Sequence, residues 1–75
     1  MSTVRRLTAV IEREGDGYFA LCPELDIASQ GDNVESALAN LKEALELFME
    51  TAAPTEITDR LRGEVFVTQL EVAVG

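Results

Sequence analysis

The carboxylates of this 75-residue chain are its most abundant groups that could do chemistry. Glu43, Glu46 and Glu50 recur at a spacing that places three carboxylates on one face of a helix. A two-metal nuclease would need further acids on neighbouring strands. The middle of the first predicted strand is Thr8–Ile11, and the middle of the last is Thr68–Leu70, and neither contains an acidic residue. The pattern therefore predicts either a solvated acidic face or a docking surface for the basic side chains of a protein partner.

Other reactive groups are few. The chain has no histidine, which removes the commonest general base and the commonest zinc ligand. Its single cysteine, Cys22, closes an apolar run and has no cationic neighbour in the sequence, so we predict a buried, unreactive thiol in a reducing compartment. We predict no enzymatic activity, no metal site and no cofactor.

Two glycine-containing segments are explained by backbone geometry rather than by anion binding. Gly15-Asp16-Gly17 precedes a strand and lacks a lysine, so it predicts a hairpin loop. Gly31-Asp32-Asn33 precedes a helical pattern, and Asp32 already places a negative charge there. This second segment therefore predicts a strand-to-helix turn and a helix cap.

The charge balance indicates the kind of partner. Fourteen acidic residues against six basic ones give a net charge of −8, and Arg5-Arg6 is the only adjacent basic pair. Phosphate contacts need clustered lysine and arginine, so we expect no direct binding of nucleic acid and a partner that is itself basic. No apolar run reaches the length of a signal peptide or a membrane span, so we expect a cytoplasmic protein without membrane contact.

The elements that position these residues follow from hydrophobic periodicity. Alternation predicts strands over 4–13, 18–22 and 28–31, and a last strand over 64–74. Apolar residues three or four apart predict a helix over 34–51, which Pro54 ends before a polar connection to Gly63. The order β-β-β-α-β predicts an α+β fold, a small, mostly antiparallel sheet with one helix packed on one face. The last strand would be reached by a right-handed crossover.

Apolar side chains on both faces of the strands predict self-association. One helix can cover only one face, so a monomer would leave an apolar patch in water. We therefore expect a homo-oligomer, a dimer or tetramer, with the last strand at the interface through Phe66, Leu70 and Val72. Tyr18, from the alternating Tyr18-Phe19 pair, is a candidate contact with a partner because aromatic residues are enriched at interface hot spots.

Several short motifs, taken in order, resemble the HicB family of bacterial antitoxins over roughly residues 7–51. They are Ala9–Glu12, Gly17–Ala20, Pro23–Leu25, Gln30–Asp32, Glu35–Leu38 and Glu43–Leu45. The family loop usually reads Pro-Asp-Leu-Pro-Gly, whereas this chain has Pro23-Glu24-Leu25-Asp26-Ile27. A toxin-recognition surface that included this loop would therefore be altered here.

The resemblance implies a partial RNase H-like fold and a single HicB-like domain over 1–75 without a C-terminal DNA-binding module. It also implies a small basic partner of the HicA type, an mRNA-cleaving toxin whose catalytic surface the antitoxin occludes. The alternative is an oligomeric interaction module of the same fold with no toxin partner. The residues that we expect to contact a partner are Tyr18, Glu24, Leu25, Glu43, Glu46 and Glu50.

Overall fold

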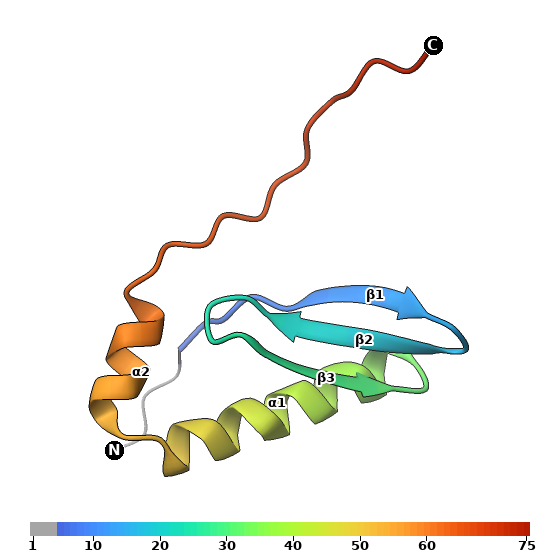
Figure 1. Cartoon of the computed structure of the whole chain (residues 1–75). Coiled ribbons are helices and arrows are strands. Elements are labelled where there is room, and N and C mark those ends of the chain that lie inside the picture. Colours follow the sequence, from blue (N-terminus) through green and yellow to red (C-terminus); the bar gives the residue numbers. More distant parts are fainter. Residues whose placement is uncertain (1–4) are drawn as a thin grey trace.

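The computed structural model describes residues 5–75, and its central feature is a three-stranded antiparallel sheet in the order β1-β2-β3 (Figure 1). β1 (Val10–Glu14) and β2 (Gly17–Cys22) form a hairpin in which Glu14 lies opposite Gly17. The two-residue loop requires a left-handed conformation, which Gly15 adopts at φ 58°. β3 (Ile27–Gly31) pairs with the other side of β2, so β1 and β3 are the two edges of the sheet.

One long helix, α1 (Val34–Thr51), covers one face of this sheet and packs mainly on β3 and β2 (Figure 1). Asn33 caps it: the Asn33 side chain accepts a hydrogen bond from the Ser36 backbone N–H at 2.7 Å, and Ser36 Oγ accepts one from the Asn33 backbone N–H at 3.1 Å. The helix begins very close to Gly31, where an added Cβ would lie 2.5 Å from the Ala37 backbone nitrogen. The lack of a side chain at Gly31 therefore permits this close approach.

The core lies between β2 and α1 and is small. Its fully buried residues come from β2, the loop that follows it and α1, and they are Ala20, Cys22, Leu25, Ala37 and Leu41. Two alanines among them, one from the strand and one from the helix, allow the two elements to approach closely. Larger side chains pack around this centre and are only partly buried, including those of Leu7, Ile11 and Phe48.

A second helix, α2 (Pro54–Leu61), occupies part of the segment that the sequence indicated as a polar connection. Pro54 does end α1, but it also starts α2, because the first turn of a helix needs no N–H from its first residues. Arg60 holds α2 against the β2–β3 loop and the end of α1. Its Nη1 donates a hydrogen bond to the Leu25 carbonyl oxygen at 2.6 Å, and its guanidinium carbon lies 4.8 Å from the centre of the Phe48 ring.

The predicted last strand is not formed. After Gly63 the chain runs away from the sheet and helices as an extended segment without secondary structure, which we call the tail (residues 64–74; Figure 1). Alternating apolar residues favour a strand, but a strand is stable only when its backbone groups are paired, and no strand of residues 5–75 pairs with the tail. The radius of gyration is 14.6 Å, against about 11 Å for a compact chain of this length.

The structure confirms the α+β class, the antiparallel sheet, the single long helix on one face and the bounds of that helix. The first strand is shorter than predicted: the ladder begins at Val10, and residues 5–9 lead into it without a strand partner. Val4, the first residue of the predicted strand, lies outside the described residues. β3 begins one residue earlier than predicted, at Ile27.

Candidate protein-interaction surface

An acidic stripe, formed by Glu35, Glu43, Glu46 and Glu50, lies on the solvent side of α1. At 100° per residue these four positions fall within about 80° of one another around the helix axis. All four are exposed, and they lie opposite the helix face that Ala37 and Leu41 bury against the sheet. The capped helix and its packed face thus hold the carboxylates in a row on a rigid element.

The acidic stripe is not neutralised by the protein itself. The ion pairs within residues 5–75 join Arg60 to Glu56 and Arg62 to Asp59, both on or next to α2. None of the four stripe carboxylates takes part in them. Lys42, one turn before Glu46 on the same helix, offsets part of this charge, but four carboxylates outnumber it. The potential in front of the helix is therefore negative, and a basic surface approaching this face would be attracted and oriented.

Glu24, predicted as a partner contact, ties the β2–β3 loop to the segment that leads into β1. Both of its carboxylate oxygens accept hydrogen bonds from the Thr8 backbone N–H, at 3.1 and 3.0 Å, and one oxygen also accepts the Thr8 hydroxyl at 2.6 Å. Partial burial of the carboxylate opposes ionisation, but the hydrogen bonds from Thr8 outweigh this effect and lower the pKa of Glu24. The geometry assigns Glu24 a structural role.

Leu25 does not form part of the surface at all. Its side chain is fully buried in the core, so the prediction that it contacts a partner is wrong for this structure. Leu25 packs with the buried residues of β2 and α1, and the next residue, Asp26, turns the chain with a left-handed conformation at φ 54°. The β2–β3 loop therefore uses Leu25 as an apolar anchor.

Tyr18 lies on the helix side of β2, together with the buried residues Ala20 and Cys22. It packs against the edge of the core, and the Arg13 guanidinium carbon lies 5.9 Å from the centre of its ring. The alternation of the strand places Phe19 on the open face instead. Phe19, rather than Tyr18, is therefore the aromatic side chain on the face that α1 leaves uncovered.

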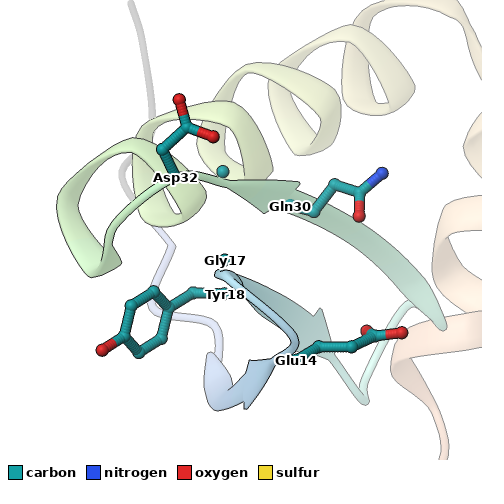
Figure 2. A pocket seen from close by; sticks show the side chains of 6 residues that line it. Glu14, Gly17, Tyr18, Gln30 and Asp32 are labelled. Atoms are coloured by element: carbon teal, nitrogen blue, oxygen red, sulfur yellow. The ribbon is translucent and has the colours of Figure 1, made fainter.

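Tyr18 also lines a pocket of about 380 Å³ at the hairpin end of the sheet (Figure 2). The other lining residues are Glu14, Gly17, Gln30, Gly31 and Asp32. Two of them are acidic and none is basic, so the pocket has no group that would hold an anion. Among residues 5–75 there is no cluster of three or more histidine, cysteine, aspartate or glutamate side chains that could hold a metal ion.

Cys22 is buried, as predicted, and its thiol is free. Burial raises the pKa of its thiol, and the neighbouring Glu24 carboxylate, 3.5 Å from the sulfur, adds to the increase. A thiol with a raised pKa and no access to solvent is a poor nucleophile.

The tail carries the three residues that we expected at an oligomer interface. Phe66, Leu70 and Val72 are 83%, 78% and 69% exposed. The structure thus leaves them on the surface of the single chain, as an interface residue must be, but without the strand pairing that we predicted for them.

Two features of the surface were not found from the sequence. Arg60 holds α2 against the β2–β3 loop, and the signal for this helix was present in Pro54 at its first turn and in the spacing of Ile57 and Leu61. The second feature is an apolar groove beside α1, which results from the placement of residues 5–9 relative to the helix. Sequence periodicity says nothing about that placement.

Comparison with known proteins assigns the family. A UPF0150 protein of Helicobacter pylori is 37% identical over 68 residues, which cover 89% of this chain and 94% of that protein. The UPF0150 proteins ssl0738 and ssr1765 of Synechocystis are 50% and 48% identical over 46 residues, which cover 59% of this chain and 64% and 58% of those proteins. This chain belongs to the UPF0150 family. No family model matches it, and no solved structure does.

Neither α1 nor α2 combines the length and hydrophobicity that a bilayer span requires, so the described part of the chain contains no membrane-spanning helix.

Proposed function

We propose that the protein is a HicB-like antitoxin, which binds a small basic toxin of the HicA type and covers its RNA-cleaving surface. The observation that carries the proposal is the acidic stripe on α1, four exposed carboxylates on one face of a rigid helix that take part in no ion pair within residues 5–75. The protein would act in the cytoplasm by stoichiometric binding, without chemistry of its own.

The charge of the whole chain supports the same proposal. A net charge of −8 at this size favours a basic partner, and electrostatic attraction would speed and orient the encounter. The sequence motifs that resemble HicB lie in the hairpin, the β2–β3 loop and α1, and these elements form the packed body of the molecule.

The test is a charge reversal on the acidic stripe. We expect a variant with Glu43→Lys, Glu46→Lys and Glu50→Lys to bind a HicA-type toxin roughly 10–100-fold more weakly at low salt, because attractive contacts become repulsive. The loss should shrink at high salt, where screening shortens the Debye length to about 3 Å at 1 M.

A matched control changes the net charge equally at the other end of the sheet. Glu12→Lys, Glu14→Lys and Asp16→Lys alter three exposed carboxylates of the hairpin, away from the stripe. We expect this variant to retain most of its affinity. If both triple variants bind equally weakly, the loss reflects net charge and not the position of the stripe. If the stripe variant binds with unchanged affinity, the stripe is not part of the binding surface.

A second candidate function is supported by the exposed tail. Several large apolar side chains there are in contact with solvent, which is unusual for a monomer. A self-associating interaction module without a toxin would explain this exposure. The two candidates are distinguished by the reading frame next to the gene, because an antitoxin is expected beside a short frame that encodes a basic protein.

A further inference from the structure

An apolar groove of about 860 Å³ runs between residues 5–9 and α1. Its floor is formed by Leu7 and Ala9 on one side and by Leu38, Leu45 and Met49 on the other. The groove exists because α1 packs on β3 and β2 and leaves the β1 side of the sheet uncovered. One wall of the groove is the segment that leads into β1, and this segment has no strand partner of its own.

The tail has the complementary properties. Phe66, Leu70, Val72 and Val74 alternate onto one face of an extended segment and are 69–92% exposed. Extended at about 3.3 Å per residue, the eleven residues of the tail span roughly 36 Å. α1 rises about 27 Å over its length, so the tail can follow the groove from end to end.

The charges of the two surfaces also match. Arg5 and Lys42 lie on the rim of the groove, together with one acid, Glu46. The tail contains Glu64 and Glu71 and no basic residue. In a chain with only six basic residues, two of them flank the groove.

We propose that this groove binds the tail of a second copy of the chain, and that two copies exchange their tails reciprocally. The second copy is favoured over the chain's own tail by the way the chain leaves α2. Arg60 fixes α2 against Leu25 and Phe48, and only Arg62 and Gly63 separate α2 from the tail, which then points away from its own body (Figure 1). Short hinges of this kind favour exchange between copies.

The exchange would cover apolar surface on both copies. Each tail brings four large apolar side chains into a groove with an apolar floor, and the exchange does this twice. The exchange would therefore cover eight large apolar side chains and both groove floors, against the roughly 1,200–2,000 Å² of total surface that stable complexes bury. The inference deepens the self-association of the second candidate function and needs no toxin.

The test combines two variants that damage opposite halves of the contact. Leu70→Asp places a charge on the groove-facing side of the tail, and Leu38→Glu places one on the groove floor, at a position that is 38% exposed and therefore tolerant. We expect light scattering to give the wild type twice the 8.2 kDa mass of one chain and each variant alone the mass of one chain. An equimolar mixture of the two variants should regain the double mass, because it pairs one intact tail with one intact groove.

Circular dichroism must show that each variant keeps its helix content, and Val67→Asp, on the opposite side of the tail, serves as the matched control that should remain a dimer. A wild type with the mass of a single chain would overturn the proposal and indicate that the tail binds elsewhere or in its own groove. A dimer that both variants leave intact, or a mixture that fails to recover the double mass, would also overturn it. These masses are measured without a basic partner, so the result is separate from that of the antitoxin test.

Discussion

The hydrogen bonds between Glu24 and Thr8 predict a defined loss of stability when the carboxylate is neutralised. Glu24→Gln keeps the size of the side chain but replaces one acceptor oxygen by a donor, which then faces the Thr8 N–H and hydroxyl. Hydrogen bonds to charged groups contribute about 1.5–3 kcal/mol. Because Glu24 is only partly buried and one acceptor remains, we expect the free energy of unfolding to fall by about 1–2 kcal/mol.

The pH dependence of this effect has a definite sign. The pKa of Glu24 is lowered in the folded protein, so its contribution to stability is fully present above the ordinary glutamate pKa of about 4.3. The contribution is lost as the pH falls through the lowered folded value, because the carboxylate is then protonated in both states. The difference between wild type and Glu24→Gln should therefore be constant near pH 7 and shrink below about pH 4.

The assay is urea unfolding followed by circular dichroism, at one protein concentration and at several pH values. A loss of 1–2 kcal/mol corresponds to a decrease in Tm of roughly 4–16 °C for a domain of this size. Glu12→Gln, at an exposed carboxylate of β1, is the control and should change stability by less than about 0.5 kcal/mol. The reasoning is refuted if both variants lose the same stability, or if the Glu24→Gln deficit grows as the pH falls.

Two further predictions concern the backbone. Gly31→Ala should destabilise the protein by about 1–3 kcal/mol in the same urea assay, because the new Cβ meets the Ala37 backbone nitrogen at 2.5 Å. The control is Gly63→Ala, where the nearest atom to the new Cβ is 4.0 Å away, and its stability should be close to that of the wild type. Asp26→Gly should raise the melting temperature by a few degrees, because glycine adopts the left-handed conformation at φ 54° without the steric cost of a side chain. A lower melting temperature for Asp26→Gly would contradict this prediction, and would show that the Asp26 side chain supplies more stability than its backbone conformation costs.

The parts of the fold that depend on local periodicity were predictable from the sequence. The apolar spacing of Val34 to Phe48 and the capping residue Asn33 fix α1 at Val34–Thr51, and the glycines around Asp16 fix the hairpin. Local patterns also indicated that Cys22 is buried. In each case the residues that carry the sequence pattern are the same residues that form the observed element.

The parts that depend on distant contacts were not predictable in this way. Alternation in the tail describes which side chains could be buried together, but not whether any strand is available to pair with them. Glu24 and Leu25 belong to a loop that the sequence suggests is exposed. In the structure Glu24 is hydrogen-bonded to Thr8, and Leu25 is buried in the core. The groove beside α1 depends on where residues 5–9 lie, which no local pattern determines.

We propose that this UPF0150 protein neutralises a basic toxin by binding it through the acidic stripe. The most direct test is size-exclusion chromatography with light scattering of the protein alone and after mixing with the product of the adjacent gene, followed by an RNA-cleavage assay of the same mixture. We expect a stable mixed complex in which cleavage stops once the protein is present in stoichiometric amount. A protein that elutes unchanged and leaves cleavage unaffected would contradict the antitoxin proposal.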